Sequence, residues 1–230
     1  MSLTGNRLID SLSEALAAEL IAASRTMELP LRTMLGSSGE VPTYGYFLTE
    51  GAASIVVVMA EGGSSEVGMI GNEGLIGASA LLGPSAIDAD TFIQIEGKGL
   101  RVPMKLLRVM FEESIELRQA IMQYVQCNIN TTGQISACNR LHEAEERLAR
   151  WLLTAADLTQ SETLGLTQEF LAQMLGSQRT TVALVAGLLQ RAGLIQYSRG
   201  KVRILNREGL ESAACDCYRV THDAVVKLYA

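Results

Sequence analysis

Apolar and polar positions along the chain follow three successive patterns. At the start of the chain, the apolar side chains recur at helical spacing, from Leu8 to Leu20. Between Met27 and Pro103, short β-rich runs such as SIVVVMA and TFIQIEG alternate with turn residues, which predicts a small antiparallel barrel or jelly roll. After Pro103 the spacing is helical again. This order predicts an α+β fold, with an N-terminal β-roll followed by a largely helical C-terminal half.

Residues 112–139 carry the pattern of one long helix. Its apolar stripe advances in steps of four and three residues, which is the spacing of one helix face. Two interpretations fit this spacing equally: a helix that faces the core, or a coiled-coil contact between two chains in which nearby polar residues help to fix the register. In the second interpretation the dimer interface consists of Leu117, Ile121, Val125, Ile129, Thr132 and Ile135.

The stretch LTQEFLAQMLGSQRTTVALVAGLLQRAGLI predicts two helices joined by a short turn. Thr167 is a suitable N-cap for the first helix, Gly176 ends it, and Ser177 is a suitable N-cap for the second helix, which runs to about Arg191. The following run LIQYSRGKVRIL predicts a β-hairpin whose turn contains Arg199. A helix-turn-helix followed by such a hairpin is a winged helix.

Charge changes the picture at this point. The chain is acidic, with a formal net charge of −6, yet the window Ser177–Arg207 contains Arg and Lys but neither Asp nor Glu. Cations suit the phosphates of DNA, while Arg and Gln at the start of a recognition helix can pair with guanine and adenine. The predicted DNA-binding residues are therefore Ser177, Gln178, Arg179, Thr180, Thr181, Arg199 and Lys201.

Composition excludes several classes of protein. A hydrophobic content of 48% and a charged content of 19% predict a globular chain with a substantial core. No apolar run is long enough to span a membrane, and Asp10 and Glu14 interrupt the segment where a signal peptide would be apolar. We therefore expect a soluble, cytoplasmic protein.

The cysteines do not predict a disulfide scaffold. Cys127 and Cys138 lie in a helical pattern, and Cys215 and Cys217 form a C-x-C near the end. The chain has only two histidines, so a Cys/His zinc site has few candidates. We expect buried free thiols and no metal, with a redox or metal role for Cys215 and Cys217 as the alternative.

Two other functional classes are alternatives to a DNA-binding regulator. An enzyme is disfavoured because the sequence has no G-x-S-x-G motif and no recognisable set of catalytic side chains; GGSSE at Gly62–Glu66 predicts a hairpin turn. The second alternative is a ligand-binding module whose winged helix contacts a protein partner instead of DNA. DNA affinity that falls steeply with salt concentration distinguishes a regulator from both.

The order of these parts resembles the Crp/Fnr family of bacterial transcription regulators. The segments EERLARWLL and LTQEFLAQMLGSQRTTV, and LLQRAGLIQYSRGKVRILNREGLE after them, are similar to the DNA-binding half of that family. The resemblance covers nearly the whole chain and implies a cyclic-nucleotide-binding-like β-roll sensor domain at 1–111, a dimerisation helix at 112–139 and a winged helix-turn-helix DNA-binding domain at 140–230. Thr180 and Leu184 stand where the family often has Glu and Arg.

The same resemblance places IGNEGLIGASALLGPSAIDADT where relatives that bind cyclic AMP hold the nucleotide. Gly77 is retained, but Ala78 stands at the position of the ribose-binding Glu. Asp88, followed by Ala89, stands at the position of the phosphate-binding Arg. An acid repels a phosphate where a cation would bind it. We therefore expect these four residues to form a degenerate effector pocket that does not bind cyclic AMP.

Cofactors and partners follow from the same comparison of residues. The iron–sulfur branch of the family that the chain resembles needs N-terminal cysteines, and the haem branch needs an axial ligand. Here no cysteine precedes Cys127 and the β-roll has no His or Cys, so we expect no cofactor. The resemblance implies a homodimer that binds double-stranded DNA at a near-palindromic operator in response to an unidentified small-molecule effector. It also makes RNA polymerase a candidate partner, and no membrane partner is expected.

Overall fold

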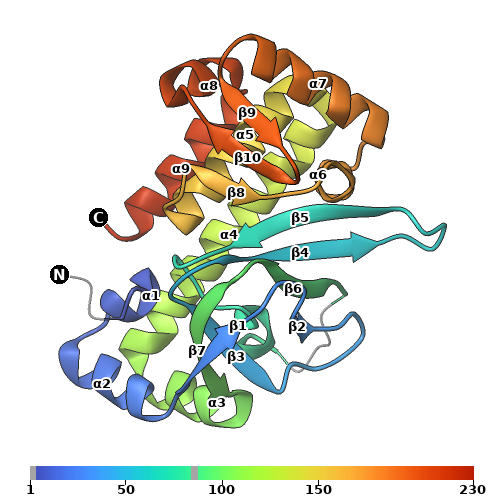
Figure 1. Cartoon of the computed structure of the whole chain (residues 1–230). Helices are drawn as coiled ribbons and strands as arrows, with labels where there is room; N and C mark the ends of the chain where they lie inside the picture. Colours follow the sequence, from blue (N-terminus) through green and yellow to red (C-terminus); the bar gives the residue numbers. More distant parts are fainter. Residues whose placement is uncertain (1–3, 84–87) are drawn as a thin grey trace.

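The computed structural model describes residues 4–83 and 88–230. Figure 1 shows a β-roll at one end of the molecule, a C-terminal domain at the other, and the long helix α4 (Ile115–Leu141) running along both. The predicted α+β fold, with a β-roll, a long helix and a C-terminal winged helix-turn-helix, is confirmed. Among the described residues, no helix is long and apolar enough to cross a membrane.

The β-roll consists of two antiparallel sheets. Its strands are β1 (Arg25–Leu29), β2 (Met34–Gly36), β3 (Tyr44–Leu48), β4 (Ala52–Val58), β5 (Ser64–Ile70), β6 (Asp90–Ile95) and β7 (Gly97–Pro103). One sheet has the order β1-β7-β3 and the other β2-β6-β4-β5. Side chains from both sheets, including Leu48 of β3 and Ile93 of β6, share one core. The GGSSE segment lies at the β4–β5 hairpin, as predicted, where Met59 N donates to Gly63 O at 2.7 Å.

Short helices cover one side of the roll. They are α1 (Arg7–Asp10), α2 (Glu14–Ala22), the 3-10 helix η1 (Ala78–Leu81) and α3 (Met104–Glu113). Leu8 of α1, Leu20 of α2 and Leu107 of α3 are fully buried and pack in a second core with the start of α4. The apolar spacing at the chain's start is therefore explained by helices that cover the roll.

The predicted stripe along α4 divides between core and surface. Leu117 and Ile121 have no exposed surface because they pack into the core with α1 and α3, so they are not available to a partner chain. Val125 and Ile135 are half-buried, Thr132 is exposed, and Ile129 is 63% exposed. Each step of four residues advances about 40° around a helix, so repeated steps turn a stripe away from its starting face.

The C-terminal domain surrounds α5 (Ala144–Thr159). Its other helices are α6 (Gln168–Met174), α7 (Arg179–Arg191), α8 (Arg207–Ala213) and α9 (Cys217–Leu228), and its sheet contains β8 (Thr163–Gly165), β9 (Ile195–Ser198) and β10 (Lys201–Ile204) in the order β8-β10-β9. Trp151 of α5 is 1% exposed and lies in the same core as Val182 and Leu189 of α7. The outer strand β8 was not predicted from the sequence.

Several contacts join the C-terminal domain to the β-roll: Trp151 Nε1 of α5 donates to Glu66 Oε1 of β5 at 2.8 Å, and two further places of contact are formed by the end of α9 and by α6. At the end of α9, the Tyr229 hydroxyl donates to the Glu73 carbonyl, and the Arg7 guanidinium lies 4.8 Å from the centre of the Tyr229 ring. At the other place, Gln173 of α6 donates from Nε2 to Ser64 Oγ of β5 at 3.2 Å. Figure 1 shows the β4–β5 hairpin extending beneath α6.

Candidate nucleic-acid interface

The α6–α7 turn has the form that the sequence predicts, with one change. Thr167 caps α6, since its Oγ1 accepts from Phe170 N at 3.1 Å. Gly176 adopts a φ of +54°, a left-handed conformation that a residue with a Cβ rarely takes. The N-cap of α7 is Gln178, not Ser177. The Ser177 hydroxyl instead accepts from Arg147 of α5 at 3.2 Å.

Arg147 is a residue whose role the sequence did not indicate. Its guanidinium donates to the carbonyl of Leu175 at 3.1 Å as well as to Ser177. It therefore fixes the end of α6 and the start of the turn against α5.

The outward face of α7 begins with the predicted base-contacting residues. Gln178, Arg179 and Thr180 are exposed, and Thr181 is half-buried. One turn further along, Leu184 is 62% exposed, although it is apolar and its neighbour Val185 is buried. An exposed leucine on a recognition helix can contact the methyl group of thymine. Leu184 was not among the predicted DNA-binding residues.

The wing is a tight β-hairpin. Arg199 and Gly200 link β9 to β10 with φ values of 49° and 74°, as a type I′ turn requires at both central positions. Arg199, Lys201 and Arg203 are exposed on or beside this turn. Tyr197 of β9 connects the wing to α7, because its backbone N–H donates to Gln190 Oε1 at 2.7 Å. Burial raises the pKa of its hydroxyl, and the nearby charge of Arg179 opposes that rise.

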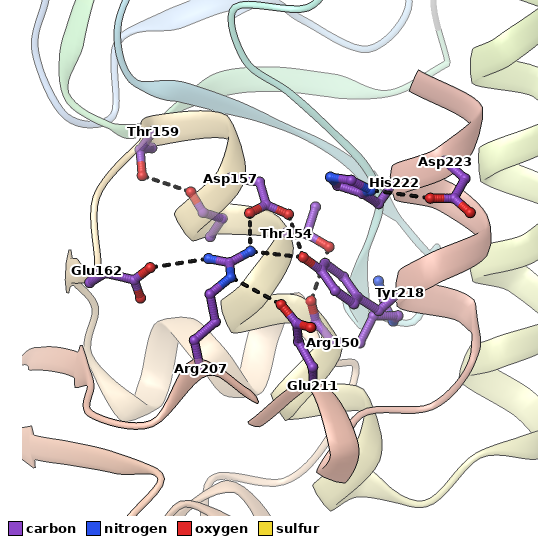
Figure 2. A network of polar contacts seen from close by, with 11 residues as sticks. Arg150, Thr154, Asp157, Thr159, Glu162, Arg207, Glu211, Tyr218, His222 and Asp223 are labelled. Carbon is purple, nitrogen blue, oxygen red and sulfur yellow. Dashed lines mark hydrogen bonds and ion pairs between the residues drawn. The ribbon is translucent and has the colours of Figure 1, made fainter. Parts of the chain in front are cut away.

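Arg207, the last cation of the basic window, has a different role. Figure 2 shows its guanidinium between Asp157, Glu162 and Glu211, with the Tyr218 hydroxyl also within hydrogen-bond distance. The Arg207 Nη1–Glu162 and Nε–Glu211 distances are 3.1 and 3.0 Å. These contacts join α8 to α5 and leave Arg207 unavailable to DNA. Among the described residues, no acid forms an ion pair with the remaining cations, which are Arg179, Arg191, Arg199, Lys201 and Arg203.

The predicted degenerate pocket can be placed in part. Gly77 has a φ of +89° and precedes η1, whose first residue Ala78 is buried. Asp88 is exposed and Ala89 is buried just before β6. The connecting residues 84–87 of this motif lie outside the described part of the chain.

A cavity of about 280 Å³ lies elsewhere, between the β-roll, α4, α5 and α9. Its lining includes Glu66 of β5, Arg150 of α5 and Thr221 of α9, together with Asn72 and Glu73 from the start of the predicted nucleotide motif. It does not include Gly77, Ala78, Asp88 or Ala89. Burial raises the pKa of both Glu66 and Glu73 to about 7. Arg150 is 5% exposed and forms no ion pair with a described residue. Sequence periodicity gave no sign of this cavity.

Comparison with known proteins identifies the C-terminal part and the fold. Residues 146–213 match the family model described as a Crp-like helix-turn-helix domain. No curated protein matches the sequence. The solved structure of FixK2 from Bradyrhizobium japonicum is similar over 84% of this chain and 98% of that one, with a TM-score of 0.70 and 14% identity.

Two further solved structures agree. A transcriptional regulator of the CRP family from Thermus thermophilus has a TM-score of 0.69 and 21% identity, covering 82% of this chain and 96% of its own. The c-di-GMP-responsive global regulator CLP from Xanthomonas campestris has a TM-score of 0.68 and 17% identity, covering 84% and 99%. The chain thus carries a Crp-like helix-turn-helix domain within the fold of the Crp/Fnr regulators, and the resemblance seen in the sequence is confirmed.

Proposed function

We propose that this protein is a cytoplasmic transcription regulator that binds double-stranded DNA in a sequence-specific manner. The observation that carries the proposal is the surface formed by α7 and the wing. Its helix presents Gln178, Arg179 and Thr180 to solvent, and its cations have no acidic partner among the described residues. Helix N-termini of this kind contact base edges in the major groove, and wing cations contact phosphates.

We further propose that the protein binds DNA as a homodimer through the exposed face of α4. Ile115, Met122 and Ile129 are 63%, 52% and 63% exposed and lie seven residues apart. Seven residues make nearly two full helical turns, so these side chains share one face. An apolar row of this spacing suits a two-stranded coiled coil, with Thr132 beside it. The two-fold axis of such a dimer would place its two recognition helices at half-sites about 34–36 Å apart.

The signal is proposed to act where the β-roll meets the C-terminal domain. The cavity between them is lined by β5, α4, α5 and α9, so a ligand there would contact both halves of the chain. A ligand changes an equilibrium between two arrangements only if it binds one of them better. Cyclic AMP is not proposed, because Asp88 stands where its phosphate would need a cation.

The test is selection of bound duplexes from a random DNA pool by the purified full chain. Recovery of a two-fold symmetric motif, with affinity that falls steeply as salt increases, supports the proposal. The selection is repeated with a small-molecule cell extract added, because DNA binding can require an effector that the purified chain lacks. Failure to enrich any motif in either condition contradicts DNA binding and favours a winged helix that contacts a protein partner.

A further inference from the structure

Four side chains with metal-binding atoms meet where α4 ends and α9 begins. Cys138 lies in the last turn of α4, and His142 is the C-cap residue of that helix. Cys215 lies between α8 and α9, and Cys217 is the first residue of α9. The three sulfurs and the imidazole nitrogen all lie within 4.8 Å of one another. The cysteines are buried, and His142 is half-buried.

The distances within this cluster fit a tetrahedral metal site. Zn–S bonds of about 2.3 Å and a Zn–N bond of about 2.0–2.1 Å place two sulfurs roughly 3.8 Å apart, and a sulfur and a nitrogen roughly 3.6 Å apart. Cys138 Sγ lies 3.4 Å from Cys215 Sγ, and Cys217 Sγ lies 3.5 Å from His142 Nδ1. These two distances are therefore close to the edges of such a tetrahedron, and all the donor–donor distances are within 4.8 Å.

The surroundings suit a site with excess negative charge. Gln134 Nε2 lies 3.0 Å from Cys217 Sγ, where its N–H can donate to a thiolate. The buried Arg150 interacts electrostatically with Cys138 and Cys215, and it has no ion-pair partner among the described residues. Zn²⁺ with three thiolates and a neutral imidazole carries one net negative charge. Arg150 offsets that charge and gains the counter-ion that a buried cation needs.

We propose that Cys138, His142, Cys215 and Cys217 bind a structural Zn²⁺ ion. Thiolate and imidazole donors select zinc over magnesium or calcium, which prefer oxygen ligands. Four protein ligands leave no open position, so the site is structural and not catalytic. On binding, the three thiols release their protons to solvent, and the imidazole binds in its neutral form through Nδ1.

The ion would connect parts of the chain that are far apart in sequence. It fixes the start of α9 to the end of α4, and the far end of α9 contacts Arg7 and Glu73 of the N-terminal half. The network around Arg207 and Tyr218 in Figure 2 holds the same region to α5. The metal site thus stabilises the helix that joins the two halves of the chain. This inference does not depend on DNA binding.

Two other states of the same cysteines make different predictions. A Cys138–Cys215 disulfide requires a sulfur–sulfur distance of about 2.05 Å, shorter than the 3.4 Å observed. A simple cluster of buried thiols does not account for His142, which brings a polar nitrogen to the three sulfurs. Both states lack a bound metal, so metal binding distinguishes them from the zinc site.

The experiment uses the full chain, reduced and freed of metal by a chelator, and titrates it with Co²⁺ in the absence of oxygen. We expect saturation at one Co²⁺ per chain, with the visible bands of tetrahedral cobalt and a thiolate-to-cobalt charge-transfer band, all removed by Zn²⁺. Cys217→Ser should lose the tetrahedral spectrum. His142→Cys should keep the ion and strengthen the charge-transfer band. Cys127→Ser is the matched control, because Cys127 is a buried free cysteine outside the cluster, and it should behave as the wild type.

Three results would overturn the inference. One is a wild-type chain that gives no tetrahedral cobalt spectrum. Another is a Cys217→Ser variant that binds Co²⁺ as tightly as the wild type. The third is a Cys138–Cys215 disulfide in protein isolated without reductant, together with no metal uptake after reduction. The wild-type spectrum itself reports thiolate ligation, so the test remains decisive even if a variant fails to fold.

Discussion

At the scale of single residues, identical side chains within the basic window have different roles. Arg179 is exposed on α7 with no acidic partner in the described part of the chain, whereas Arg207 lies among Asp157, Glu162 and Glu211. The absence of acids from the window does not reveal this difference, because the acids that pair with Arg207 lie outside it: Asp157 on α5, Glu162 just after α5, and Glu211 one turn further along α8. Of these two arginines, only Arg179 is therefore expected to contribute directly to base recognition.

Substitution of Arg179 by Ala should weaken binding to the selected operator by about 1–3 kcal/mol and relax one base position, because a bidentate contact to guanine is lost. Substitution of Lys201 by Ala should weaken all duplexes alike and flatten the dependence of log K on log salt concentration by about one unit. Fluorescence anisotropy with the operator and a scrambled duplex measures both. Equal losses on both duplexes for Arg179→Ala contradict its assignment to base readout.

A second residue prediction concerns Glu66, whose carboxyl is buried between Ser54 and Trp151. Burial raises its pKa to about 7, and hydrogen bonds from Ser54 and Trp151 and the charge of Arg150 oppose that rise. The folded chain therefore keeps this proton at pH values where the unfolded chain has lost it. The free energy of unfolding should consequently fall as the pH rises from about 4.5 to about 7.

Glu66→Gln reproduces the protonated carboxyl, since its amide can donate to Ser54 Oγ while its oxygen accepts from Trp151 Nε1. Relative to the wild type, the variant should gain up to about 3 kcal/mol of stability between pH 4.5 and pH 8. Urea unfolding of both proteins at several pH values measures this difference in the free energy of unfolding. The titration of Glu73 does not change the difference, because both proteins contain Glu73. Glu61→Gln, at the exposed tip of the β4–β5 hairpin, is the control. A constant difference at all pH values would contradict the prediction.

At the scale of elements, the sequence predicted what periodicity and turn chemistry encode. The helices α6 and α7, the Arg199–Gly200 turn and the β-strands of the roll all carry such signals. Strand β8 was missed because a strand of three residues is too short to show alternation. Ser177 was predicted as the N-cap from its residue type, but its hydroxyl accepts a hydrogen bond from Arg147, which lies on another helix. The sequence around Ser177 does not show this hydrogen bond, because Arg147 lies 30 residues earlier in the chain.

The wing turn offers a test at this scale. Gly200→Ala should destabilise the chain by about 1–2 kcal/mol, because its φ of 74° disfavours any residue with a Cβ. The added Cβ would meet only Thr167 Cγ2 at 3.7 Å, an ordinary contact, so the cost lies in the backbone. Gly165→Ala on β8 is the matched control, with open space around its Cβ and no positive φ. Urea midpoints measure both, and equal midpoints would refute the assigned turn.

At the scale of the whole molecule, the sequence predicted the order of parts but not how distant parts meet. Nothing in the sequence pattern shows that Tyr229, just after α9, contacts Glu73. For the same reason, the cluster of Cys138 with Cys215 could not be foreseen, since their positions are 77 residues apart. The stripe on α4 is a further example: its spacing fitted both core and dimer, and only the fold separates Leu117 from Ile129.

The exposed row on α4 gives the prediction for the assembled molecule. If Met122 and Ile129 form the centre of a coiled-coil contact, a Met122→Glu/Ile129→Glu double variant places like charges opposite each other across the two-fold axis and should be monomeric. Light scattering after gel filtration measures the molar mass of each variant in solution and so distinguishes monomer from dimer. Val220→Glu, at a 51% exposed position on α9, is the control and should leave the dimer intact. The monomer should also lose the preference for two half-sites over one, because each chain then binds independently. A double variant that remains dimeric would show that the dimer interface does not lie on this face of α4.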